Sequence, residues 1–206
     1  MARPNVLING VRTRAGRTLA ASFRAAGYYT VGLDRQDDYD YRCDRFVQFD
    51  TVRFEQETDY RIRFSEVLDR LLPGVDVLIH ALPPYEFSDS TGLSLPTWKN
   101  FHSGHLAGSL LVAQLLLPKI SQANGLQLVC PPFEPPQDTN DREATPLLNR
   151  AAHLLYEALR LQSGPGIRVA GLAPAVPGSD TQQLSATAVY LASEAGQSTD
   201  GVYWAL

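Results

Sequence analysis

Short apolar runs alternate along the whole chain with longer amphipathic stretches. The apolar runs have the length of β-strands and occupy residues 5–9, 29–33, 45–49, 75–81, 126–130, 167–172 and 202–206. Between them, apolar side chains recur at helical spacing and predict helices over 17–26, 64–72, 106–120, 147–161 and 187–193. Strands that are apolar throughout and separated by helices are typical of a parallel sheet covered on both faces. The pattern therefore predicts a doubly wound, Rossmann-like α/β fold of about seven strands.

This alternation continues without an internal repeat or a linker, so we expect residues 1–206 to form a single domain with no separate substrate domain. With 44% hydrophobic residues, a chain of 206 residues can bury a substantial core. The one break in composition is the segment 131–146, which contains five prolines and several charged residues. Such a composition predicts an irregular loop.

Composition and charge narrow the classes of partner. A formal net charge of -4 argues against binding to nucleic acid through bulk positive charge. The longest uncharged apolar run, 110–118, is far shorter than a bilayer span, and no signal-peptide pattern opens the chain. Cys43 and Cys130 suggest neither a disulfide framework nor a zinc site, and no cluster has metal-ligand spacing. We therefore expect a cytoplasmic protein with no metal and with no nucleic acid or membrane as partner.

The turn after the first strand carries the first candidate chemistry. It contains Gly10 and Gly16, follows a strand and opens a helix, which is the context of a dinucleotide-binding turn. Glycine allows a tight turn and close approach of the backbone to a pyrophosphate, which the helix N-terminus attracts. Asp34 ends the second strand and favours NAD(H) over NADP(H), because a carboxylate accepts hydrogen bonds from a ribose and repels a 2′-phosphate; Arg35 weakens this preference. The alternative is that these are ordinary turn glycines and a solvated acid.

From Val6 to Tyr203, the sequence resembles the short-chain dehydrogenase/reductase family. The first turn is similar to that family's Thr-Gly-x-x-x-Gly-x-Gly, with Asn9 in place of Thr and Arg14 in place of the middle Gly. Residues 76–83 resemble the strand that leads into Asn-Asn-Ala-Gly, and 188–193 resemble the last helix. The resemblance implies a nicotinamide dinucleotide, NAD(H) or NADP(H), as cofactor. The cofactor contacts that it implies, with Asp50 placed at the adenine, are Gly10, Arg12, Arg14, Gly16, Asp34, Asp50, Ala81 and Pro174.

Within this family, Arg14 resembles the arginine of pteridine reductases, including the dihydromonapterin reductase type. In those enzymes the arginine reaches the cofactor phosphates and the pterin, and an aromatic residue packs on the pterin ring. Tyr85 stands at the matching distance from His80 in this chain. An aromatic face and a guanidinium suit a planar heterocycle that forms hydrogen bonds. The resemblance thus implies Arg14 and Tyr85 as pterin contacts, and the alternative is a solvated arginine and a loop tyrosine.

The catalytic residues of the family are missing. The family uses a Ser-Tyr-Lys set in which the lysine follows the tyrosine by four positions. The two lysines, Lys99 and Lys119, follow Leu95 and Leu115 at that spacing, so the chain contains no Tyr-x-x-x-Lys. Arg150 is the cation that falls near the lysine position, but it does not titrate as a shifted lysine can. The family's substrate loop is also short here, with about a dozen residues between Pro174 and the helix predicted at 187.

Two histidines fall at the expected cofactor side and are the remaining candidates for a proton donor. His80 ends the fourth strand, and His105 stands where the family usually has a catalytic asparagine. The alternative is that both rings only fill space.

Two functions stay open. One is a non-catalytic or redirected protein that binds a dinucleotide or a pterin, or serves as a partner subunit. The other is an NAD(P)H-dependent pteridine reductase with a different proton donor. The resemblance also implies a homodimer or higher homo-oligomer, or a hetero-oligomer with an active relative.

Overall fold

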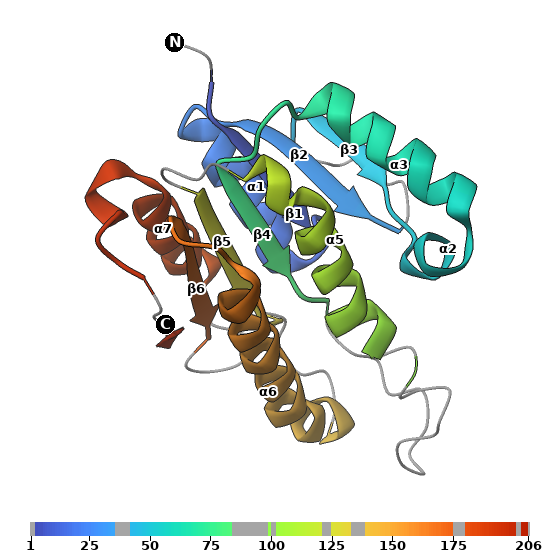
Figure 1. Ribbon diagram of the computed structural model, residues 1–206. Helices are drawn as coiled ribbons and strands as arrows, with labels where there is room; N and C mark the ends of the chain where they lie inside the picture. Colours follow the sequence, from blue (N-terminus) through green and yellow to red (C-terminus); the bar gives the residue numbers. More distant parts are fainter. Residues whose placement is uncertain are drawn as a thin grey trace.

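In the computed structural model, the described residues are 3–35, 42–83, 99, 102–120, 125–132, 139–174, 180–200 and 203–205. Seven strands form one sheet in the order β3-β2-β1-β4-β5-β6-β7, and all of its pairings are parallel (Figure 1). The strands are β1 (Asn5–Asn9), β2 (Tyr29–Asp34), β3 (Arg45–Gln48), β4 (Val77–Ala81), β5 (Gly125–Cys130), β6 (Ile167–Ala173) and β7 (Tyr203–Ala205). This order confirms the doubly wound parallel sheet that the sequence predicts. Its direction of growth reverses between β1 and β4, the two neighbouring strands at the centre.

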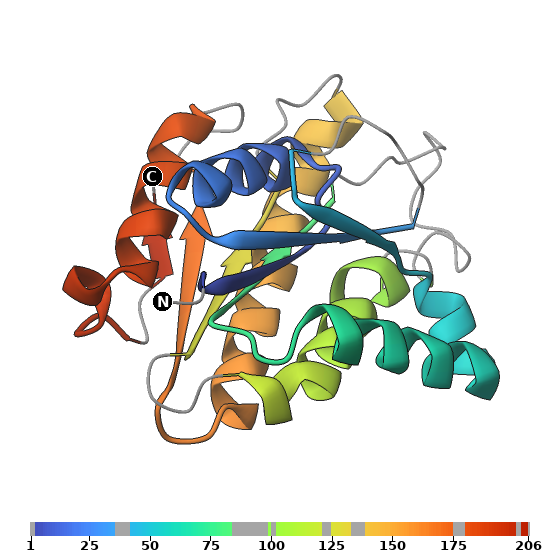
Figure 2. The same ribbon diagram turned by 90° about the horizontal axis from the view of Figure 1, so that it is seen from above.

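Helices cover both faces of the sheet. The helical segments are α1 (Arg14–Ala25), α2 (Thr51–Gln56), α3 (Thr58–Leu71), the π-helical η1 (His102–Ala107), α5 (Gly108–Leu116), the 3-10 turn η2 (Leu117–Lys119), α6 (Thr139–Gln162), α7 (Thr181–Ala192) and the 3-10 turn η3 (Glu194–Gly196). Figure 2 shows the same layers from above, with the sheet between the two sets of helices. None of the helices in the described ranges combines the length and hydrophobicity needed to cross a membrane.

Alternation along the strands divides the core between these two faces. In β1, Val6 and Ile8 pack with Leu19 of α1 and Leu184 of α7. Leu7 points to the other face and joins the cluster formed by α2, α3, α5 and α6. Period-two alternation of an apolar strand therefore gives it two buried faces. Burial of one large apolar side chain contributes about 1.5–3 kcal/mol, so both clusters stabilise the sheet strongly.

Side-chain caps explain why several helices begin earlier than the hydrophobic spacing predicts. The hydroxyl of Thr13 accepts a hydrogen bond of 2.9 Å from the Gly16 N–H, so α1 begins at Arg14 rather than at residue 17. Asp180 accepts one of 2.9 Å from the Gln182 N–H, so α7 begins at Thr181 rather than at residue 187. The short helix α2 was not predicted, because six residues carry too little periodicity to reveal it.

The proline-rich segment is less irregular than its composition predicts. Residues 139–146 belong to α6, so the prediction of a loop over 131–146 is wrong for this part. Four of the five prolines lie at 131–136, before the helix. Pro146 lies within α6, where it lacks the N–H that would donate one helical hydrogen bond. The sequence between residues 139 and 145 contains no glycine, and it carries the acids that favour a helix N-terminus. Residues 133–138 lie outside the described part.

Candidate functional site

The candidate site lies at the carboxyl edge of the sheet, beside the reversal of strand order. Asn9 ends β1, Asp34 ends β2 and Ala81 ends β4, which places all three at this edge. Doubly wound sheets bind ligands outside the carboxyl ends of their strands at such a reversal. The turn from β1 to α1 starts at this position.

Gly10 is required here by its conformation and by its surroundings. Its φ angle is +87°, a region that favours glycine. A Cβ atom at this position would stand 2.0 Å from the carbonyl oxygen of Ala81. The N–H groups of Gly10 and Val11 both donate to the Leu33 carbonyl, at 2.9 and 3.2 Å. The turn thus packs closely against β4 on one side and forms hydrogen bonds with β2 on the other.

Gly16 brings the first turn of α1 onto the same backbone. A Cβ atom at Gly16 would lie 2.2 Å from the carbonyl oxygen of Gly10. That carbonyl accepts hydrogen bonds from the Thr13 N–H, at 3.1 Å, and from the Thr13 hydroxyl, at 2.9 Å. Such close helix packing is one of the roles that glycine plays in dinucleotide-binding turns. The geometry therefore fits a turn that presents its backbone and a helix N-terminus to a phosphate.

The Asp34 carboxylate is held against this turn. One oxygen accepts a hydrogen bond of 3.1 Å from the Arg12 N–H, and the other accepts one of 2.8 Å from the Arg35 N–H. Burial raises the pKa of Asp34, while these two hydrogen bonds and the nearby Arg12 and Arg35 charges lower it. A carboxylate has about four acceptor positions, so each oxygen retains capacity for a further donor. The predicted contact of this carboxylate with a ribose stays a prediction.

Positive charge accumulates at the start of α1. Arg12 and Arg14 are half-buried, Arg17 is exposed, and the first turn of the helix contains no acidic residue. Cations at a helix N-terminus are opposed by the helix dipole, and the Asp34 carboxylate beside the turn offsets part of this charge. The contacts of Arg14 with a cofactor phosphate and with a pterin stay predictions. Tyr85, the second predicted pterin contact, lies outside the described residues.

Asp50 has a clear local role. Its side chain accepts a hydrogen bond of 3.1 Å from the Arg53 N–H and so caps α2. Its own N–H donates to the hydroxyl of Tyr60, at 2.8 Å. Sequence reasoning missed Tyr60, which also stacks on Phe64 and orders the segment after β3. The predicted contact of Asp50 with an adenine stays a prediction beside this capping role.

His80 lies inside the core. Its ring is 0% exposed on β4, and the buried Gln127 side chain of β5 is a polar neighbour of the ring. Burial lowers the pKa of His80 to about 4, with the Gln127 side chain acting in the opposite direction. The imidazole is therefore neutral at pH 7 and has no surface from which to exchange a proton. This placement favours the alternative that the ring fills space, and its role as a proton donor stays a prediction.

The other predicted contacts are described only in part. The backbone of His105 lies in η1, but its side chain is outside the described part. Ala81 is buried and turns its carbonyl toward Gly10, and Pro174 is buried after β6. Sequence reasoning missed Gln127, a buried amide on β5 that acts on the pKa of His80. A glutamine within the apolar run of β5 is the signal that would have identified it.

The region between β5 and α6 differs from the turn at Gly10. Pro131 and Pro132 follow β5, where the family resemblance places a serine. Arg150, near the expected lysine position, is exposed on α6. Tyr156 has the spacing of a Tyr–Arg pair with Arg160, but it is 2% exposed in the core. After Pro174, only residues 175–180 precede α7, fewer than the dozen that the sequence predicts.

The strand order and the glycine turn define a Rossmann-like fold. We compared the chain with known proteins to see which of them share this fold. No protein-family model matches the chain, and no curated protein matches its sequence. Among solved structures, the fold is that of short-chain dehydrogenases/reductases.

Three of these structures cover nearly the whole chain. The 3-ketoacyl-(acyl-carrier-protein) reductase from Brucella melitensis, complexed with NADH, is 18% identical, with a TM-score of 0.74, and the match covers 98% of this chain and 96% of that one. The RhlG/NADP complex from Pseudomonas aeruginosa is 17% identical, with a TM-score of 0.77 and coverage of 100% and 95%. A short-chain dehydrogenase from Leptospira borgpetersenii with bound NAD+ is 15% identical, with a TM-score of 0.72 and coverage of 100% and 91%. At these identities, the likeness shows a shared fold.

Proposed function

We propose that this chain is a divergent short-chain dehydrogenase/reductase that binds a nicotinamide dinucleotide, NAD(H) in preference to NADP(H), at the turn between β1 and α1. The observation that carries the proposal is the backbone contact of Gly10 with Ala81, made beside a carboxylate that the Arg12 N–H holds in place. Solved structures of the same fold carry NADH, NADP and NAD+. Asp34 supports the preference for NAD(H), because its charge repels a 2′-phosphate. When bound, the nicotinamide would supply hydride transfer.

We further propose that the chain is non-catalytic or redirected, serving as a dinucleotide-binding sensor or a partner subunit. The sequence contains no Tyr-x-x-x-Lys, and prolines follow β5 where the resemblance implies a serine. The short connection at 175–180 leaves little chain to close over a substrate. Reduction by hydride transfer needs a positioned substrate and a proton source. The short connection leaves little chain to position a substrate, and the missing tyrosine and lysine remove the family's proton source.

One observation favours a second candidate, a reductase of pteridine type with a different proton donor. Arg14 is the first residue of α1 and is half-buried at the turn where a dinucleotide would lie. A guanidinium at this position suits a planar heterocycle with several acceptors. An acid assists less when the substrate is easily reduced, as a quinonoid pterin is, so the missing tyrosine weighs less against such a reaction.

A homodimer, or a pairing with an active relative, would form through α6. Leu154 and Leu161 on this helix are 62% and 88% exposed. Large exposed apolar side chains on one helix mark an interaction surface, and self-association of like surfaces is the commonest arrangement.

The test is a thermal-shift titration of the full chain with NADH, NADPH and a dihydropterin, singly and together. A ligand that binds only the folded state stabilises it by about 2.7 kcal/mol at a concentration 100 times its Kd. We expect a larger rise in Tm with NADH than with NADPH, and the Asp34→Asn variant should lose this difference. No rise with either dinucleotide would overturn the proposal.

Activity distinguishes the two candidates. We expect no oxidation of NADH above background with dihydropterins or quinonoid pterins. Turnover with any of them would replace the non-catalytic proposal with the reductase.

Size-exclusion chromatography with light scattering tests the dimer, and the matched variants Leu161→Gln and Leu154→Gln should shift it toward monomer. A monomer in the unsubstituted chain would exclude the homodimer.

A further inference from the structure

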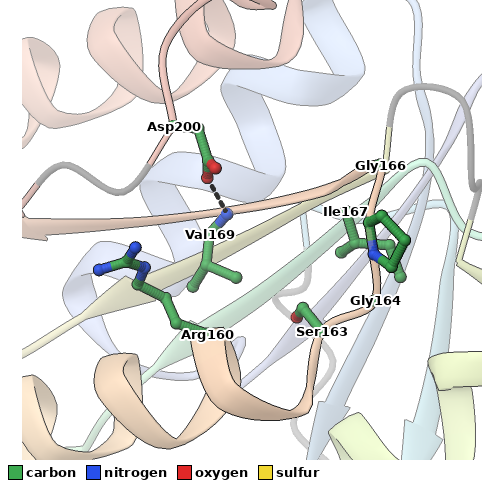
Figure 3. Close-up of a pocket in the computed structure, with 8 residues that line it drawn as sticks. Arg160, Ser163, Gly164, Gly166, Ile167, Val169 and Asp200 are labelled. Carbon is green, nitrogen blue, oxygen red and sulfur yellow. Dashed lines mark hydrogen bonds between the residues drawn. The ribbon is translucent and has the colours of Figure 1, made fainter.

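A cavity lies at the amino edge of the sheet, the end opposite to the dinucleotide turn. It has a volume of about 180 Å³ and lies where α6 ends and β6 begins (Figure 3). Its lining consists of Arg160, Ser163, Gly164, Pro165, Gly166, Ile167, Val169 and Asp200. This volume has room for several waters or for one small organic molecule.

Each polar side chain of this lining is oriented by a hydrogen bond or a ring contact with another residue. Asp200 accepts a hydrogen bond of 3.1 Å from the Val169 N–H, the contact dashed in Figure 3. The guanidinium of Arg160 lies over the ring of Tyr156, 5.8 Å from its centre. The Ser163 hydroxyl oxygen accepts a hydrogen bond of 2.8 Å from the Gln127 side-chain amide. Sites whose polar groups are held by such partners lose little entropy when a ligand binds.

The contact with Gln127 is the observation that separates this cavity from a simple surface depression. Gln127 is 1% exposed on β5, and its side chain also acts on the buried ring of His80. The amide nitrogen fixes the Ser163 oxygen as an acceptor from inside the protein. The hydroxyl hydrogen of Ser163 then stays available as a donor, and Ser163 lines the cavity.

The two charged side chains of the lining are not paired with each other, although the Asp200 carboxylate acts on the buried Arg168 guanidinium, opposing the burial that lowers its pKa. Of the ion pairs formed within the described ranges, none joins the Arg160 guanidinium to the Asp200 carboxylate. A cation and an anion that line one small cavity without neutralising each other are complementary to a ligand that carries both charges. We propose that this cavity binds a small zwitterion of the class of free α-amino acids, with the carboxylate facing Arg160 and Ser163 and the ammonium facing Asp200.

A titration of the full chain followed by NMR tests this site, using amide shifts of residues 163–169 and 200. The probes are glycine and L-alanine, with acetate and methylammonium as ligands that carry one of the two charges. We expect saturating shifts with the amino acids in the millimolar range, which suits so few ligand atoms. Acetate and methylammonium should each bind about tenfold more weakly, because each loses one charge-assisted contact.

Two exposed positions provide variants that keep the fold. Asp200→Asn retains an acceptor for the Val169 N–H and removes the charge, and Arg160→Gln removes the cation at the edge. Each should weaken amino-acid binding about tenfold. Arg150→Gln, at another exposed arginine of α6, is the matched control and should leave it unchanged. Equal binding of acetate and alanine, equal loss in the control, or no saturating shift would each overturn the proposal. None of these outcomes depends on the dinucleotide site at the other edge.

Discussion

The turn between β1 and α1 and the junction between β5 and α6 lie at the same edge of one sheet, but they are built differently. At the first, contacts are made by backbone atoms: Gly10 lies against the Ala81 carbonyl, and Gly16 lies against the Gly10 carbonyl. At the second, the chemistry of the related fold depends on side chains, and this chain has Pro131 and an exposed Arg150 there. Backbone contacts constrain the fold itself, whereas reactive side chains do not.

The difference teaches that binding and chemistry are separable in this architecture. A side chain at Gly10 would displace β4, so the sheet requires glycine at this position. The turn between β1 and α1, which we call the cradle, is therefore retained as long as the sheet is retained. A serine, tyrosine or lysine near α6 stabilises a transition state and contributes little to folding. A chain without the second set can therefore keep the turn between β1 and α1, as the proposed dinucleotide binding requires.

The largest expected effect comes from Gly10→Ala. The positive φ costs an alanine about 1–2 kcal/mol, and the clash with the Ala81 carbonyl adds an overpacking cost of about 1–3 kcal/mol. We expect a loss of about 2–5 kcal/mol in the free energy of unfolding, measured by urea denaturation. Gly27→Ala is the control, because Gly27 has a φ of +90° with no atom within 4 Å of the added Cβ. It should lose only the conformational part, and equal losses would show that the contact with β4 carries no weight.

His80 sharpens the comparison, because β4 lies between the two regions. Burial holds the folded-state pKa of His80 at about 4, against an ordinary value of 6.5. Below pH 6.5 the unfolded chain therefore takes up a proton that the folded chain does not, and stability falls as the pH falls toward 4. The total loss is about 3 kcal/mol.

Urea denaturation between pH 7 and pH 4 measures this slope. His80→Asn should reduce it, and His153→Asn, at an exposed position on α6, should leave it unchanged. The same slope in all three chains would place the acid sensitivity elsewhere.

Much of the fold could be predicted from the sequence, but the candidate site could be predicted only in part. The apolar runs identify all seven strands, and the central ones are the clearest because a strand buried on both faces has little choice of residue. Helix ends were less predictable, since α1 and α7 begin at side-chain caps that hydrophobic spacing does not reveal. Gly10 and Asp34 could be assigned to the turn and the strand end, because a turn after a strand restricts the residue type, and their contact with a cofactor stays a prediction. The burial of His80 was not, because a histidine at a strand end reads equally as a proton donor and as a core residue.

Asp34→Asn tests how much the cradle depends on charge. The amide keeps an oxygen that accepts from a backbone N–H, but it loses the negative charge. We expect the Kd for NADH to rise about tenfold and the preference over NADPH to disappear, because one charge-assisted hydrogen bond is lost and the repulsion of a 2′-phosphate is removed. Isothermal titration calorimetry measures both. Asp59→Asn, at an exposed position on α3, is the control, and an equal change there would indicate a general charge effect.

The smallest expected effect comes from a substitution at the β5–α6 junction. Arg150 is the cation nearest to the expected lysine position, and it is exposed on α6. If the turn between β1 and α1 alone holds the dinucleotide, Arg150→Gln should change the Kd for NADH by less than about fivefold, since an exposed ion pair contributes about 0.2–1 kcal/mol. A tenfold loss, with thermal stability unchanged, would mean that the β5–α6 junction still binds the cofactor. The two regions would then share one function, and the missing Tyr-x-x-x-Lys would mark a changed reaction instead of an abandoned one.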